Sequence, residues 1–389
     1  MRNLCCLVSL FLVSHLLASQ AQAESRFSGY LKNYSLIQDE IDLTSFQADK
    51  IYSSQFSGRA MLDVLGESYS TQVHYELGRD FNSDQAGLNL TAPSRNSYRL
   101  TDITSMPGEN NLKSVNRQNL DRLNIQFSLA AGDLTIGRQP ITFGSARIIN
   151  PTDVFLPFDV QTLNTEYRAG IDAIRFQSPV GQLSELDLGV VLGDDGSNNS
   201  AAFARLKSNL AGSDLELTLI RFSEQNLIGA GIETTVGQFG TWLEAASVTG
   251  DEDYLRSSVG LDYGFNGSWF AMLEYHYNGA GAEQPKDYLS RLASAPYRAG
   301  GIFLLGKHYL IPSLSWQISP LTTASLQLIR NLKDDSTFVN LAADFSLHEN
   351  LYLGISYFGF SGDEPSLPNL GSEYGANPDR LIINLRYYF

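Results

Sequence analysis

The residues at 380–389 alternate between apolar and mostly polar side chains. Leu381, Ile383, Leu385, Tyr387 and Phe389 fall on one face of an extended strand, because successive side chains of a strand point to opposite sides. The segment ends on an aromatic residue, and similar alternating segments recur along the chain. The pattern predicts a sheet protein in which one face of each strand must be covered.

Turn residues separate the alternating segments, and short turns alternate with long polar connections. Long connections are expected at 80–118, where the residues show no period, at 140–169 and at 279–307. The count gives about 18 strands, in a range of roughly 16–18. The expected strands lie near 27–34, 56–64, 71–77, 122–129, 134–139, 170–176, 185–192, 201–209, 214–221, 227–236, 240–248, 255–265, 269–278, 309–317, 322–331, 336–347, 351–360 and 380–389.

In water, so many alternating strands would need a second sheet to cover them and would leave exposed edges. Closure into a barrel within a bilayer removes the edges, and lipid then covers the apolar rows. After residue 23 no apolar run reaches the length of a membrane-spanning helix. We therefore predict an all-β fold, a transmembrane antiparallel β-barrel over residues 24–389. Its last strand is similar to the terminal strand of bacterial outer-membrane barrels.

Tyr30 and Tyr34 are expected as aromatic residues at the membrane interface. Two places leave the strand assignment open. Trp242 and Glu244 share one face, so the orientation of their strand is ambiguous. Pro312 has no N–H to donate, so its strand is expected to begin after it or to bulge there.

Residues 1–23 have the features of a secretory signal peptide, with Arg2, an apolar stretch at 4–18 and small residues before the cleavage site. Cys5 and Cys6 lie within this stretch, so the mature chain from Glu24 would have no thiol for a disulfide or a metal. The expected location is the outer membrane, reached by export through the periplasm. The 27 Lys+Arg against 42 Asp+Glu, a formal charge of −15, argue against nucleic acid as a partner.

The polar rows of the strands carry charges of both signs and are expected to line a watery interior. In the first eight strands the expected inward residues are Lys32, Arg59, Arg122, Arg175, Arg205 and Lys207, against Asp63, Glu76, Glu185 and Asp187. In the other strands they are Arg256 and Arg386, against Glu216, Glu233, Glu244, Asp262, Glu274 and Asp344. Either these charges pair with their neighbours, or a basic side and an acidic side create a transverse field that orients a solute.

Two pairs of adjacent residues allow the predicted orientation of their strands to be checked. Leu188 and Leu217 are expected to face lipid, and the adjacent Asp187 and Thr218 to face water.

The least generic stretch is Gly137-Arg-Gln-Pro-Ile-Thr-Phe-Gly-Ser-Ala-Arg147, continued by Asn150-Pro-Thr-Asp153 and Gly170-Ile-Asp-Ala-Ile-Arg-Phe176. It resembles the alginate-export-like outer-membrane porins, and this resemblance implies a channel for a small or polymeric anionic sugar. Pro140, Pro151 and Pro157 restrict the backbone of the connection and favour one packed shape. Folded into the barrel, it would form a constriction from Arg138, Arg147, Asp153, Asp159 and Arg168. The alternative is an outer loop packed over the rim.

We thus predict an outer-membrane porin, a passive channel for small polar or anionic solutes with an in-folded constriction loop. The alternative is a barrel sheath around a multihaem cytochrome in an electron conduit. Expected partners are outer-membrane lipid, lipopolysaccharide and small polar solutes; a homo-oligomer or a cytochrome partner stays open.

An enzyme is not expected, because no G-x-S-x-G motif occurs and the histidines at 74, 276, 308 and 348 lie in no recognisable nucleophile motif. No cofactor or metal is expected either. The acidic stretches at 194–196 and 251–253 lack the spacing of a calcium loop.

Overall fold

A computed structural model describes residues 23–43, 46–83, 98–101, 113–155, 166–366 and 369–389. Eighteen strands within these ranges form one antiparallel sheet. They are β1 (Glu24–Gln38), β4 (Ile51–Leu65), β5 (Tyr69–Asn82), β6 (Ser114–Leu129), β7 (Gly132–Gln139), β8 (Ile171–Pro179), β9 (Ser184–Leu192), β10 (Ala201–Leu210), β11 (Ser213–Phe222), β12 (Gln225–Val236), β13 (Phe239–Thr249), β14 (Tyr254–Phe265), β15 (Trp269–Asn278), β16 (His308–Ser319), β17 (Thr322–Asn331), β18 (Thr337–His348), β19 (Leu351–Ser361) and β20 (Arg380–Tyr388).

The remaining elements lie in the connections. A small hairpin, β2 (Ile41–Leu43) and β3 (Phe46–Ala48), joins β1 to β4. The β9–β10 connection carries the 3-10 helix η1 (Gly196–Asn199), and the β15–β16 connection carries η2 (Pro285–Asp287), α2 (Tyr288–Leu292) and α3 (Ala295–Ala299). Among the described residues, no helix is both long and apolar enough to cross a membrane.

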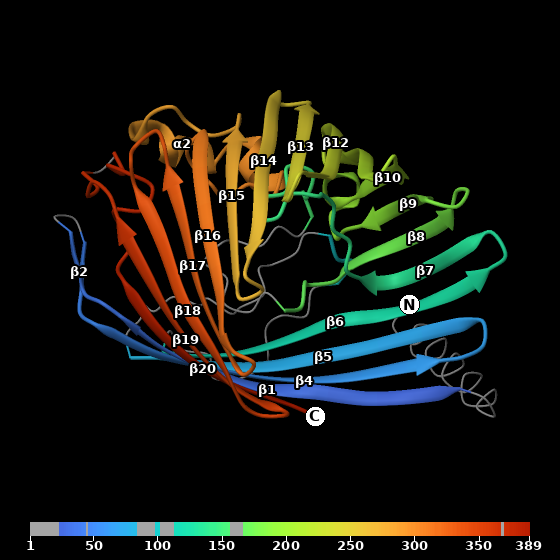
Figure 1. Ribbon diagram of the computed structural model, residues 1–389, viewed down its shortest axis with the longest axis horizontal. Helices are drawn as coiled ribbons and strands as arrows, with labels where there is room; N and C mark the ends of the chain where they lie inside the picture. Colours follow the sequence, from blue (N-terminus) through green and yellow to red (C-terminus); the bar gives the residue numbers. More distant parts are fainter. Residues whose placement is uncertain (1–22, 44–45, 84–97, 102–112, 156–165, 367–368) are drawn as a thin grey trace.

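The sheet closes on itself, which confirms the predicted fold class. Neighbouring strands pair in chain order, and β20 pairs back with β1, with Tyr30 opposite Tyr388 (Figure 1). Beyond this pair, Gly29 and Phe389 exchange two backbone hydrogen bonds of 2.9 and 3.0 Å. A Cβ on Gly29 would lie 2.3 Å from the carbonyl oxygen of Arg59 and 2.6 Å from the Phe389 ring, so only glycine fits at this seam.

The outer face of the barrel is apolar, as the alternation predicts. Leu188 and Leu217 are 38% and 47% exposed, whereas Asp187 and Thr218 beside them are buried. The apolar residues of the last strand are exposed in the same way. Lipid is the environment in which such a surface is stable, because the closed ladder leaves no free strand edge.

The predicted strand bounds in the second half agree with the structure to within two residues. The long connection predicted at 80–118 is shorter, because β5 continues to Asn82 and β6 begins at Ser114. A buried pair explains the difference: Arg117 donates hydrogen bonds of 2.7 and 2.9 Å to Asp80 on the adjacent strand. Polar residues that pair across two strands look like loop residues in the sequence.

Side-chain orientation and strand register settle the expectations for the two tyrosines, for Trp242 and Glu244, and for Pro312. Tyr30 and Tyr34 are buried on the inner face, so their prediction as interface aromatics is wrong. Trp242 and Glu244 both point inward, and Leu243 between them is exposed. Pro312 lies within β16, the register to β17 is the same on both sides of it, and the irregularity of that strand lies at 317–319 instead.

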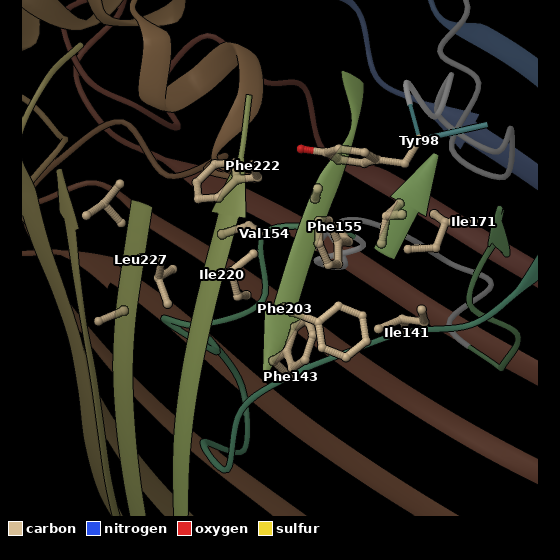
Figure 2. Packing of buried hydrophobic residues seen from close by; sticks show 14 of the residues in the cluster. Tyr98, Ile141, Phe143, Val154, Phe155, Ile171, Phe203, Ile220, Phe222 and Leu227 are labelled. Atoms are coloured by element: carbon tan, nitrogen blue, oxygen red, sulfur yellow. The ribbon is translucent and has the colours of Figure 1, made fainter. Parts of the chain in front are cut away.

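Two clusters of buried hydrophobic residues lie inside the barrel. The first joins inward side chains of β8–β14 to residues of the long connections; Figure 2 shows Phe143 beside Phe203 and Phe155 near Tyr98. The second lies on the inner face of β16–β20 and β1 and includes Ile149 from the β7–β8 connection. Part of the interior is therefore packed like a protein core.

Candidate constriction inside the barrel

Residues 140–155, here called the inner segment, lie inside the barrel along its β10–β15 wall. The segment is held there by Glu244 of β13, whose side chain is only 1% exposed. Its carboxylate accepts hydrogen bonds from the backbone N–H of Ser145 at 2.7 Å, of Ala146 at 2.8 Å and of Thr152 at 2.8 Å, and from Thr152 Oγ1 at 2.7 Å. One carboxylate thus satisfies four donors of a segment that has no regular structure.

A second carboxylate, that of Glu274 on β15, is fully buried and holds the next part of the inner segment. It accepts from the N–H groups of Arg147 and Ile148 at 3.2 Å and of Ile149 at 2.9 Å. Trp242 Nε1 donates to the same carboxylate at 2.9 Å, which accounts for the inward tryptophan. The acidic residues predicted to line this wall therefore anchor the inner segment.

Residues 166–170, here called the return arm, lead back to β8 on another side of the barrel. Glu166 pairs with Lys32 on β1 and accepts a hydrogen bond of 2.8 Å from Tyr388 Oη on β20. Arg168 binds Asp153 of the inner segment at 2.6 Å. Burial raises the pKa of the Tyr167 hydroxyl. The β7–β8 connection therefore contacts both the β13–β15 wall and the β1–β20 seam.

The predicted basic residues of the first half are paired with carboxylates. Arg138 binds Asp172 through two hydrogen bonds of 2.7 and 2.9 Å. Arg175 and Arg205 share Asp187 at 2.8 and 2.7 Å, which explains why Asp187 is buried rather than exposed to water. Thr218, also expected to face water, is buried and donates to Glu216. These contacts agree with the interpretation that charges pair with neighbours.

Asp121 is a central residue that the sequence pattern did not reveal. It pairs with Arg59 and with Arg122, at 2.8 Å in the second case, and it accepts from the N–H of Gly170 at 2.8 Å. The register of β6 against β5 shifts between His74 and the next residue, so Asp121 and Arg122, although consecutive, are both buried inside. Such a bulge re-aims a side chain, and alternation alone gives no sign of it.

A further piece of the interior comes from the β5–β6 connection, which the sequence predicted as a surface loop. Arg99 is buried and donates to Gly170 O at 2.7 Å and to Asn119 at 2.8 Å. Arg138 donates to Thr101 O at 2.8 Å, and Tyr98 packs on Phe155. For Tyr98 and Arg99 the prediction of a surface loop is wrong, because their side chains are buried against the inner segment and its flanking strands, whereas Leu100 and Thr101 remain exposed.

Arg147 lies apart from the other predicted constriction arginines. Its guanidinium binds Glu233 at 2.7 Å and lies 3.8 Å from Asp262, and its side chain remains 46% exposed. Arg138 and Arg168 lie instead on the side of β7 and the return arm. Asp159, which was expected beside them, lies outside the described residues.

Two further residues predicted to line the pore, Lys207 and Glu185, make longer contacts with neighbouring strands. Lys207 lies 3.6 Å from Glu216, and Glu185 accepts a hydrogen bond of 3.2 Å from Gln177.

Inward side chains of β17 and β18 differ from those under the inner segment. Ser325 and Asp344 are exposed and Gln327 and Asn340 are partly exposed, whereas Glu244 and Glu274 are covered. Solvent therefore reaches the interior next to β17 and β18. The described residues contain no group of three or more His, Cys, Asp or Glu side chains arranged to hold a metal.

A third carboxylate joins the connections at the long-loop end of the barrel. Glu373 in the β19–β20 connection accepts from Leu305 N at 2.8 Å, Tyr309 Oη at 2.6 Å and Asn331 Nδ2 at 2.7 Å. Its own N–H donates to Asp334 at 2.8 Å. Burial raises the pKa of Glu373 to about 7.

No family profile and no curated protein sequence matches the chain. Solved structures with the same fold do match. OpdK of Pseudomonas aeruginosa, an outer-membrane protein, has a TM-score of 0.58 at 9% identity, over 94% of this chain and 98% of that one. OccAB2 of Acinetobacter baumannii has a TM-score of 0.58 at 10% identity, with the same coverage. OccD3 of P. aeruginosa gives 0.56 at 8% identity, over 95% of this chain and 92% of that one. The chain thus shares the barrel fold of these Occ and Opd proteins, and the alginate-export-like porins are not among these structures.

Proposed function

We propose that this protein is an outer-membrane porin, a passive channel for small polar solutes. The observation that carries the proposal is the inner segment, held by Glu244 and Glu274 inside a barrel with an apolar outer face. A wide barrel needs such a segment to set its width and its field, because an open lumen of this size would pass solutes with little discrimination. Residues 1–23 would act as the signal for export and be removed.

The charge pairs bear on the preferred solute. The proposed channel accepts small polar solutes, among them small anions. Arg138, Arg175 and Arg205 are each bound to a carboxylate, so their charge is largely balanced within the wall. The similar OpdK has been solved with vanillate, a small organic acid, which supports small solutes as the class.

The packed interior favours a channel over a sheath around a cytochrome. The inner segment and the first hydrophobic cluster fill the space beside β8–β14, where a partner protein inside the barrel would have to fit. The proposed channel interacts with outer-membrane lipid, with lipopolysaccharide and with its solute. The proposal assigns it no catalytic reaction.

The test is ion conductance of the purified mature chain in a planar lipid bilayer. We expect discrete conductance steps from protein whose gel mobility changes on boiling, as a closed barrel in detergent should show. A correctly folded barrel without conductance steps, or one that copurifies with haem, would refute the channel.

A further inference from the structure

Four tyrosine rings, here called the tyrosine row, lie inside the barrel across the β1–β20 seam. The ring of Tyr167 in the return arm lies 5.7 Å from that of Tyr30 on β1, between ring centres. Tyr30 lies 6.3 Å from Tyr388 on β20, and Tyr388 lies 5.7 Å from Tyr352 on β19. Tyr352 follows a short turn, so the row leads from the return arm toward the short-turn end; Figure 1 shows β19, β20 and β1 side by side.

The rings of the row differ in their access to solvent. Tyr30 is fully buried, and the ammonium of Lys32 lies 4.1 Å from its ring centre. Tyr388 and Tyr352 keep part of their surface exposed. Partly exposed rings on an inner wall give a passing solute an apolar face to rest on.

The charges beside the row restrict the kind of solute. Glu166 and Asp344 have side chains that are 37% and 54% exposed, whereas their partners Lys32 and Arg386 are 1% and 24% exposed. The accessible charge is thus mostly carboxylate, which repels an anion. A cation gains little there, because both carboxylates are already paired with Lys32 and Arg386 and the Arg386 guanidinium lies 5.9 Å from the Tyr352 ring centre.

We propose that the tyrosine row binds neutral cyclic sugars, namely mono- or disaccharides, as they pass through the barrel. The C–H face of a sugar ring carries slight positive charge and matches the negative face of an aromatic ring. Its hydroxyl groups donate to carboxylates, as Tyr388 Oη donates to Glu166 at 2.8 Å. This assignment rests on the proposed channel, whose solute class it narrows.

The test compares two readouts on the mature chain, with glucose, maltose and vanillate as probes. Sugar binding to the barrel in detergent is measured by saturation-transfer NMR, which needs no conduction. Block of ion current by the same probes is measured in bilayers. We expect both sugars to bind the tyrosine row and to reduce the current, and vanillate at the same concentration not to bind the row.

The variants test the row itself. Tyr352→Ala and Tyr388→Ala should each weaken sugar binding roughly tenfold, equal to about 1.4 kcal/mol. Tyr387→Ala is the matched control, because Tyr387 is adjacent to Tyr388 and points outward; it should bind as the parent does. Should the Tyr388→Ala barrel fail to close at the β1–β20 seam, Tyr352→Ala still tests the row. In the described structure the Tyr352 hydroxyl bonds only to the carbonyl of Glu349, so its removal leaves the seam intact.

Each outcome separates the two proposals. Sugar binding in detergent that depends on these tyrosines supports the row even if no current flows, in which case the channel proposal fails. Conductance without sugar binding, equal binding by Tyr352→Ala and the parent, or vanillate binding that depends on the same rings would overturn the assignment.

Discussion

Removing the Glu244 carboxylate should release the inner segment without opening the barrel. Glu244→Ala deletes the acceptor of four hydrogen bonds between 2.7 and 2.8 Å. A hydrogen bond to a charged group contributes about 1.5–3 kcal/mol. Bonds that share one acceptor are not additive, so we expect a loss of roughly 3–6 kcal/mol in the docking of the segment. The population of the undocked state would then rise by a factor of about 10²–10⁴.

Cysteine labelling measures that population directly, because the mature chain is expected to have no cysteine. Ser145→Cys places a thiol where Oγ is now buried, and its reaction with a maleimide should be slow in the parent and at least about 100-fold faster with Glu244→Ala. Single-channel conductance should rise as well. Glu185→Ala is the control, since its carboxylate accepts from Gln177 on β8. Unchanged labelling and conductance in a folded Glu244→Ala barrel would show that Glu244 does not hold the segment.

Three further predictions concern charge, pH and lipid. Arg147→Glu would place three carboxylates together beside Glu233 and Asp262, and should shift the reversal potential toward cations, whereas Lys50→Glu in the outer hairpin region should not. Because the pKa of Glu373 is raised to about 7, the folded state keeps its proton more readily than the unfolded chain. The contribution of Glu373 to the stability of the folded state is therefore largest at acidic pH and falls as pH rises through 7. Limited proteolysis of the loops should increase from pH 5 to pH 8 in the parent and be insensitive to pH in Glu373→Gln; an identical pH profile in both would contradict this. Leu217→Arg on the lipid face should cost about 2–4 kcal/mol of unfolding free energy, much more than Ser325→Arg on the inner face, and equal costs would reverse the assigned orientation.

The barrel could be predicted from the sequence because every strand of the barrel follows the same alternation of apolar and polar residues. Lipid on one face and a polar interior on the other impose a period of two, which places Leu217 outside and Thr218 inside. The same rule assigns Glu244 and Glu274 to the inner face. It gives no information about which backbone N–H groups these carboxylates bind, because those partners lie about a hundred residues away in the chain.

The interior could be predicted only in part, for two physical reasons. The bulge at Asp121 interrupts the alternation of inward and outward residues in β6, and no turn residue in the sequence marks its position. Tyr98 and Arg99 lie in a stretch without period but are buried by contacts with Phe155, Gly170 and Asn119, so burial here depends on partners and not on composition. That the β7–β8 connection could fold inward was predicted from its prolines and its length. That Arg138 would be structural, bound to Asp172, was not.

The seam between β1 and β20 has a consequence for how the molecule is made. Every other ladder of the barrel joins strands that are neighbours in the chain, and such hairpins form from nearby residues. The contact between Gly29 and Phe389 joins residues 360 positions apart, so closing it costs the most loop entropy and we expect it to form last. Until then two strands keep unpaired edges that can bind other chains. A growing barrel of this kind would therefore need protection at its two edges up to the final pairing, and any change that enlarges Gly29 should accumulate open, protease-sensitive sheets rather than misfolded barrels.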